Sequence, residues 1–144
     1  MDSAKTHELV ANWYAAMGKF DWDTVMNALA DDVVFNLFPK SYTKMIPYLG
    51  KWVGKAAFAE ASRIRNETSK ISGLDLHGVV AEGNAAVALI TSKATCIATG
   101  KYFELEIVQW IAVNDGGKIV KVDAYFDPVP EMDAFQPGVV PGVS

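Results

Sequence analysis

The chain has 144 residues, of which 51% are hydrophobic and 11% aromatic, so it is long enough for one domain with a core and too apolar for a disordered protein. Its 13 basic and 17 acidic residues give a net charge of −4 without any basic cluster, which argues against nucleic acid and anionic membranes as partners. The single cysteine, Cys96, excludes an intrachain disulfide and does not support a cysteine-ligated metal site.

The sequence contains no apolar run of the roughly 18 residues that a membrane span needs. The stretch MDSAKTHEL lacks the apolar core of a signal peptide, so we expect a cytoplasmic protein. The two histidines, His7 and His77, are isolated from carboxylates at ligand spacing, so we expect no metal site.

Three helices are expected in the first half of the chain. The first covers about residues 3–17 and ends at Gly18. Asp21 is a good N-cap for a second, short helix, whose apolar residues recur at i, i+3, i+4 and i+7. The third covers about residues 55–69, with Phe58, Ala61 and either Ile64 or Arg65 on its inner side.

The strands follow a different pattern. A period of two predicts a strand over about residues 33–38, and an irregular stretch, 39–54, follows it. We interpret that stretch either as a lid over a pocket or as a packed loop. Glycine-containing turns separate further expected strands near 74–82, 85–98, 102–113 and 118–127.

Helices that precede a strand meander are typical of an α+β domain with a mostly antiparallel sheet. We expect this domain to cover residues 1–128. Residues 129–144 follow Pro128 and are rich in proline. We expect them to form a loosely packed tail.

The strand expected over residues 102–113 carries the sharpest functional signal. Its odd positions are apolar apart from Gln109, so this amide should point into the core. A buried amide without a partner costs about 1–3 kcal/mol. Gln109 is therefore either bonded to a tyrosine or the backbone with no ligand role, or it orients a ligand in a pocket.

The preceding strand has an unusual inner face of small residues, interrupted by Ile90, with Ser92 and Cys96 as its weakly polar members. Small side chains on the inner face of a curved sheet leave room, either for close helices or for a cavity, and we favour a cavity. Neither Ser92 nor Cys96 has an evident base partner, which argues against nucleophilic catalysis.

The outer face of the sheet should expose Val108 and Trp110, with Tyr125 from the next strand. An apolar patch rimmed by acids favours a subunit interface, so we expect a homodimer through this face. On the same parity, Asp123 and Asp127 point away from the cavity.

Three stretches, WYAAMGKFDWDTVMNALADDVVF, YLGKWVGKAAF and GGKIVKVDAYFDP, are similar in order and spacing to the SnoaL-like branch of the nuclear transport factor 2-like superfamily. The resemblance covers about residues 8–128. It implies a cone in which three helices pack on a strongly curved, mostly antiparallel sheet and enclose a deep apolar pocket. Such proteins usually form dimers through the open sheet face.

The resemblance implies less about the reaction. Ketosteroid isomerase, in the same superfamily, uses an aspartate base, and a comparison without gaps places Leu37 at that position. Its phenol on the first helix falls at Trp13, with Tyr14 one residue away, and its neutral carboxylic acid donor falls at Gln109.

Limonene-epoxide hydrolase is similar in its terminal strand, but its catalytic aspartate there matches Ala124. Its other catalytic residues, an arginine and an aspartate, fall near Lys93 and Thr95, which are not equivalent. The catalytic sets of these relatives are therefore not intact in this chain.

From these observations we expect an enzyme that binds a small hydrophobic, oxygenated molecule and catalyses isomerisation, cyclisation or elimination without a cofactor. Gln109 would donate to a carbonyl or oxyanion, and Tyr14, or Tyr42 and Tyr48, would transfer protons. The candidate substrate-binding residues are Trp13, Met17, Phe35, Leu37, Tyr42, Tyr48, Trp52, Phe58, Ile90, Ser92, Cys96, Ile107, Val122, Ala124 and Phe126.

Two alternatives stay open. One is a non-catalytic protein that binds a hydrophobic ligand or serves only in dimerisation, since fold predicts function poorly. The other is an enzyme of the epoxide-hydrolase type. A carboxylate or a tyrosine cluster near Gln109 would favour an enzyme over the non-catalytic alternative.

Overall fold

The structure is a computed structural model of the chain, and it describes residues 1–37 and 45–137. Four helices and six strands are present in these two segments. In chain order they are α1 (Ser3–Gly18), α2 (Trp22–Asn27), β1 (Leu29–Leu37), β2 (Gly50–Val53), α3 (Lys55–Thr68), β3 (Ser69–Glu82), β4 (Ala85–Cys96), β5 (Tyr102–Val113), β6 (Ile119–Phe126) and α4 (Val129–Phe135).

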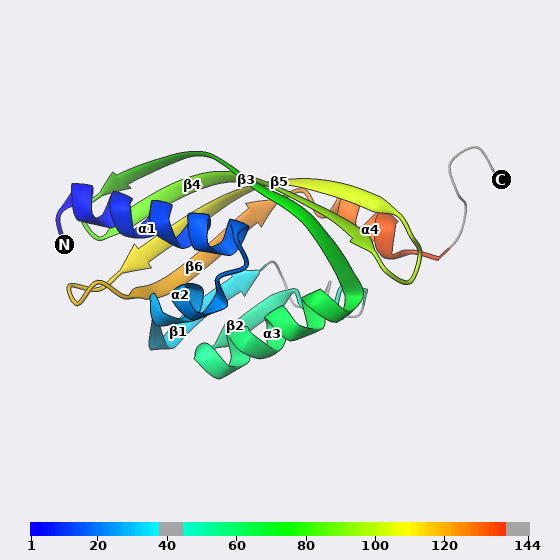
Figure 1. The fold of residues 1–144 in the computed structure, drawn as a ribbon, viewed down its shortest axis with the longest axis horizontal. Coiled ribbons are helices and arrows are strands. Elements are labelled where there is room, and N and C mark those ends of the chain that lie inside the picture. Colours follow the sequence, from blue (N-terminus) through cyan, green and yellow to red (C-terminus); the bar gives the residue numbers. More distant parts are fainter. Residues whose placement is uncertain (38–44, 138–144) are drawn as a thin grey trace.

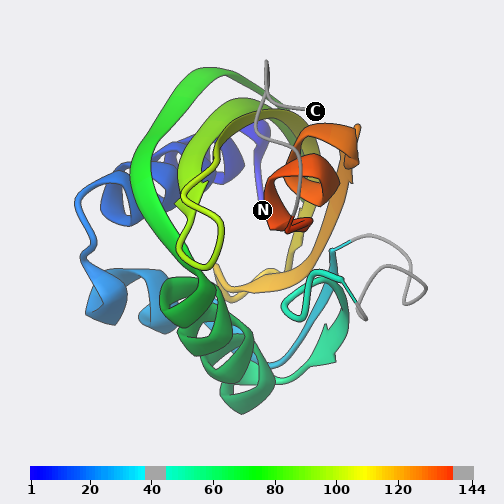
Figure 2. The same cartoon turned by 90° about the vertical axis from the view of Figure 1, so that its right-hand side faces the viewer.

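The six strands form one mixed sheet in the order β2-β1-β6-β5-β4-β3 (Figure 1). All neighbouring strands are antiparallel except β1 and β6, which are parallel. Figure 2 shows the long strands following an arc, with α4 lying inside it. The α+β class and the mostly antiparallel sheet predicted from the sequence are confirmed.

The helices begin where the sequence provides caps. The Asp21 carboxylate accepts a hydrogen bond from the backbone N–H of Thr24, which confirms the predicted start of α2. Gly54 stands before α3 with a positive φ of 94°, a conformation that a side chain would strain. Its N–H donates to the carbonyl of Val33, so the turn into α3 is fixed on β1.

The sheet has one apolar face that is covered by the helices. Trp13 of α1, Phe58 of α3 and Ala134 of α4 all belong to one core with the inward residues of β1, β4, β5 and β6. Phe35 stacks on Phe58 with ring centroids 4.1 Å apart, which joins β1 to α3. The core is therefore continuous from the first helix to the last.

Two elements depart from the sequence expectation. Strand β2 lies within the stretch that we expected to be irregular, and it pairs with β1 from Val53 opposite Val34 to Gly50 opposite Leu37. Residues 129–135 form helix α4, where we expected a loose tail, because Glu131 and Ala134 are buried against the rest of the domain. The Thr99 hydroxyl also donates to the Ala134 carbonyl at 2.5 Å.

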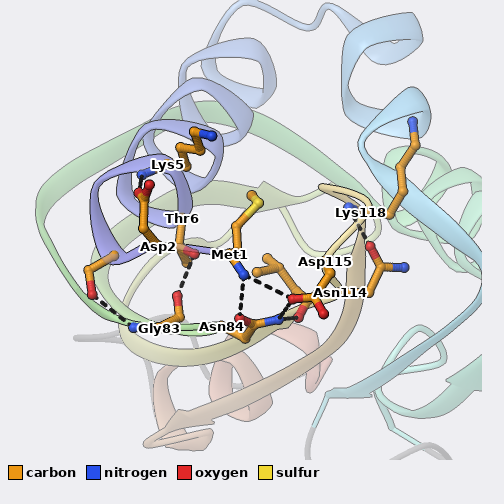
Figure 3. Close-up of polar contacts among 11 residues, drawn as sticks. Met1, Asp2, Lys5, Thr6, Gly83, Asn84, Asn114, Asp115 and Lys118 are labelled. Atoms are coloured by element: carbon orange, nitrogen blue, oxygen red, sulfur yellow. Dashed lines mark hydrogen bonds and ion pairs between the residues drawn. The ribbon is translucent and has the colours of Figure 1, made fainter.

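Polar contacts fix the start of α1 to two turns of the sheet (Figure 3). The fully buried Thr6 donates its hydroxyl to the Gly83 carbonyl at 2.5 Å. The amino group of Met1 donates to Asn84 and Asp115, each at 2.9 Å. In Figure 1 the start of α1 lies at one end of the molecule and α4 lies at the other. Helices α1 and α4 therefore cover opposite ends of the sheet.

The hydrogen bond of Thr6 allows a test of how the start of α1 is held on the sheet. Replacing Thr6 by Val keeps the size of the side chain but leaves the Gly83 carbonyl without its partner. We expect the free energy of unfolding to fall by about 1 kcal/mol or more in urea denaturation. The control, Thr24→Val, removes an exposed hydroxyl and should change stability by about 0.5 kcal/mol or less. An equal loss in both variants would contradict this role of Thr6.

Candidate functional site

A cavity of about 130 Å³ lies between the helices and the inner face of the sheet. Its wall comes from all four helices, from strands β1, β3, β4, β5 and β6, and from the segment before β2. Most of the predicted site residues meet in this wall: Trp13, Tyr14, Met17, Phe35, Leu37, Tyr48, Phe58, Ile90, Ser92, Ile107, Gln109, Ala124 and Phe126.

Of the other four predicted residues, three are described and do not line the cavity. Trp52 donates its indole N–H to the Tyr48 carbonyl at 3.0 Å, so it bonds a wall residue but does not itself line the cavity. Cys96 and Val122 are buried in the core but do not line the cavity. Tyr42 lies outside the described residues.

The segment before β2 packs tightly in its described part. Ile46, Tyr48 and Leu49 are buried, and they form a second apolar cluster with Ile64 of α3 and Phe135 of α4. The described part of this segment thus fits the packed-loop interpretation rather than the lid.

Gln109 faces the cavity, as the alternation along β5 predicts. Tyr14 of α1 donates its hydroxyl hydrogen to Gln109 Oε1. Because its carbonyl oxygen is engaged in this way, the amide presents its N–H₂ group, which makes no hydrogen bond to the described part of the chain. Burial raises the pKa of the Tyr14 phenol far above its usual range, so Tyr14 stays neutral and holds the amide in place.

A second polar pair lies at the α4 end of the cavity. The Tyr48 hydroxyl donates to Glu131 Oε2 at 2.6 Å, and both residues are buried. The other carboxyl oxygen, Oε1, is buried without a hydrogen-bond partner among the described residues. Burial raises the pKa of Glu131, although the bond from Tyr48 and the charge of Arg65 oppose this effect.

A cation is the third polar element of the wall. Arg65 of α3 donates from Nη2 to the hydroxyl of the buried Ser92 at 3.0 Å. Arg65 forms no ion pair with any residue that the structure describes. Its charge is close enough to Glu131 to influence that carboxyl, but the two side chains are not bonded to each other.

Sequence reasoning missed Glu131 and left Arg65 as one of two alternatives. The start of α4 does carry a helix signal, because Pro130 stands in the first turn and Glu131 follows it. The spacing of Met132 and Phe135 also places two apolar residues on one helix face, and both pack against the second cluster. The local pattern gives no sign, however, that Glu131, directly before Met132, is buried.

Other kinds of site are not found in the described ranges. No group of three or more His, Cys, Asp or Glu side chains there could hold a metal ion. Across the same residues, no helix has both the length and the apolar character needed to cross a membrane.

The family of the chain follows from its sequence and fold together. A model of the SnoaL-like domain matches residues 10–122, which is most of the chain. The chain belongs to the SnoaL-like family. This confirms the resemblance found in the sequence. A comparison with curated proteins gives no match.

Solved structures agree with the family assignment. An NTF2-like protein from Burkholderia xenovorans superimposes with a TM-score of 0.79 at 24% identity, over 94% of this chain and 99% of that one. A candidate polyketide cyclase from Pseudomonas putida gives 0.71 at 22%, over 93% and 98%. An LEH-like epoxide hydrolase from M. tuberculosis gives 0.68 at 19%, over 92% and 90%. At these identities the comparisons show a shared NTF2-like fold.

The burial of Glu131 predicts how stability depends on pH. A carboxyl whose pKa is raised on folding binds its proton more tightly in the folded state. Its contribution is fully present below the unfolded pKa, near 4.5, and is lost as the pH rises through the folded pKa. Wild type should therefore lose stability over this interval relative to Glu131→Gln, which keeps an acceptor for Tyr48.

Urea denaturation at a series of pH values measures this difference. Asp133→Asn, an exposed change on the same helix, is the matched control and should track wild type. If the difference between wild type and Glu131→Gln does not change with pH, Glu131 does not carry a raised pKa.

Proposed function

We propose that the chain is a cofactor-free enzyme with a cone-shaped pocket, acting on a hydrophobic, oxygenated small molecule. The reaction class is isomerisation, cyclisation or elimination through an enol-like intermediate. The observation that carries this proposal is the Glu131 carboxyl, buried in the cavity wall with Oε1 unpartnered among the described residues. The same cavity also contains the amide N–H₂ of Gln109, which likewise has no partner in the described part of the chain.

The two groups fit complementary roles. Glu131 Oε1 takes a proton from a carbon next to a substrate carbonyl, and the electron pair moves onto the carbonyl oxygen. The N–H₂ of Gln109 donates to that oxygen as its charge develops, in a largely apolar site where such a bond is strong. The proton then returns from Glu131 to another carbon, or an adjacent leaving group departs with the electron pair.

The tyrosines have supporting roles in this mechanism. We expected Tyr14 to transfer protons, but its hydrogen is engaged with Gln109, so we assign it a positioning role. Tyr48 bonds one oxygen of Glu131 and leaves the other free for the substrate. A raised pKa brings a carboxyl nearer to neutral pH, where general acid–base catalysis is most effective.

The alternatives have less support from the site. The two positions that carry aspartates in ketosteroid isomerase and limonene-epoxide hydrolase, Leu37 and Ala124, are apolar parts of the cavity wall. Lys93, near the hydrolase arginine position, is paired with Asp75 at 3.1 Å and does not line the cavity. For a protein that only binds an apolar ligand, a buried acid with an unpaired oxygen would be a cost without a function.

The proposal is tested with 2-tetralone, a bicyclic ketone with exchangeable protons next to its carbonyl. Exchange of these protons for deuterium is followed by NMR. We expect wild type to accelerate the exchange. Glu131→Gln should slow the catalysed rate by about 100-fold or more, since it removes the base. Gln109→Leu should slow it by about 100- to 1000-fold, since it removes the donor to the oxyanion.

Asp133→Asn is again the control, because it changes an exposed acid on the helix of Glu131 and should leave the rate unaltered. Binding of the ketone by wild type without any accelerated exchange would instead favour the non-catalytic alternative. Equal exchange in wild type and Glu131→Gln would exclude Glu131 as the base.

We also propose that two copies of the chain associate through the outer sheet face. Val108 pairs with Leu89 on one side and Tyr125 on the other, and Trp110 lies two residues further along β5. These four side chains are between 41% and 61% exposed, so they form one apolar patch across three strands. In a dimer with a two-fold axis, the patch of one copy would be covered by the same patch of the other copy.

Light scattering tests the association. We expect wild type at micromolar concentration to have twice the chain mass of 15.6 kDa. Trp110→Glu places a charge in the patch and should give the single-chain mass. The matched control, Tyr102→Glu, changes an exposed aromatic residue of the same strand outside the patch. A single-chain mass for wild type would rule out the dimer.

A further inference from the structure

A second cavity, also of about 130 Å³, adjoins the first. It lies between the end of α1, the start of α2, α3 and the first part of β3. The two cavities share five wall residues, Met17, Trp22, Ser62, Arg65 and Leu74. Arg65 therefore stands at the boundary between the two spaces.

Arg65 is not bonded to an acid in the described part of the chain. The described residues that line the second cavity include no acid. Glu131 is the acid in the wall of the first cavity, and it is bonded to Tyr48 rather than to Arg65. A half-buried guanidinium that is not paired with a described acid is suited to hold an anion from a ligand, because it offers several N–H donors in a planar fork.

Ser92 adds a second donor at the same place. Its Oγ accepts the hydrogen bond from Arg65, which leaves its own hydroxyl hydrogen available. The residue is only 2% exposed, so a group that it bonds must lie inside the protein. The guanidinium and the hydroxyl together form a compact polar subsite in an otherwise apolar wall.

We propose that Arg65 and Ser92 bind an acidic oxygen group of the substrate, a carboxylate or an acidic enol, so that the substrate is an apolar acid rather than a neutral hydrophobic molecule. This inference rests on the proposed function, since it places the substrate in the same cavity. The apolar body of the substrate lies toward Gln109, and its acidic group lies at the boundary of the two cavities.

Binding of the anion would also affect the base. The charge of Arg65 opposes the rise in the pKa of Glu131. An anion on Arg65 offsets that charge, so Glu131 becomes more basic when an acidic substrate is bound than when the cavity is empty. The subsite thus connects recognition of the substrate with activation of the carboxylate.

The test compares 2-naphthoate with 2-naphthamide, which share a bicyclic body and differ in charge. Titration calorimetry at neutral pH gives the affinity of each. We expect wild type to bind 2-naphthoate at least about tenfold more tightly, as a hydrogen bond to a charged group predicts. Arg65→Met should abolish the preference, and Arg65→Lys should keep part of it.

Arg63→Met is the matched control, since Arg63 lies on the same helix but is exposed and paired with Glu60 and Glu67. It should keep the full preference. Thermal unfolding of each variant shows whether it is folded. If Arg65→Met does not fold, Arg65→Lys tests the site in its place. The proposal is overturned if wild type has no preference, if neither probe binds, or if folded Arg65→Met keeps the preference.

The outcomes separate this inference from the proposed function. Preference for 2-naphthoate without accelerated exchange of 2-tetralone would support the subsite and reject the enzyme. Accelerated exchange that depends on Glu131, without any preference for 2-naphthoate, would support the enzyme and reject the subsite.

Discussion

The hydrogen bond between Tyr48 and Glu131 is the interaction on which the site depends. It joins the segment before β2 to helix α4, and both partners are buried. The Tyr48 ring also packs edge-on against Phe135 of α4, which in turn packs against Phe103 of β5. If either polar partner were lost, the other would remain buried and unpaired, at a cost of about 1–3 kcal/mol.

This bond explains how an acid can be kept in an apolar cavity. Tyr48 bonds one carboxyl oxygen, and Arg65 supplies a nearby positive charge without bonding the carboxyl. A direct ion pair with Arg65 would lower the pKa of Glu131 and occupy the free oxygen. In the observed arrangement that oxygen has no partner among the described residues, and burial keeps the pKa of the carboxyl raised.

Tyr14 and Gln109 form a similar pair at another place in the cavity wall, in which a tyrosine hydroxyl again donates to a side-chain oxygen. One tyrosine holds one end of a polar group and leaves the opposite end for a ligand. Since the intervening wall is apolar, a substrate carbonyl has few other donors in the described part of the site. Two tyrosine-held polar groups, Gln109 and Glu131, thus lie in the same cavity wall as the Arg65–Ser92 pair.

Much of this arrangement could be predicted from the sequence. Alternation along β5 placed Gln109 inward, because strand periodicity is a local property. The alanines of β4 did not locate the cavity, since the β4 residues that line it are Ile90 and Ser92, while Ala88 and Ala94 are packed in the core. Arg65 stayed ambiguous, since it and Ile64 are neighbours at the edge of the buried helix face. Glu131 was missed because the burial of an acid is decided by residues distant in sequence, here Tyr48 and the inner face of β5.

The pKa of the buried Glu131 carboxyl can be measured directly. NMR of protein labelled with ¹³C at the glutamate side-chain carboxyl carbons follows each carboxyl through a pH titration, and Glu131→Gln assigns the resonance. We expect one resonance that disappears in this variant and titrates clearly above the usual glutamate value of 4.5. If the Glu131 resonance titrates with those of the exposed glutamates, the account of this site is wrong.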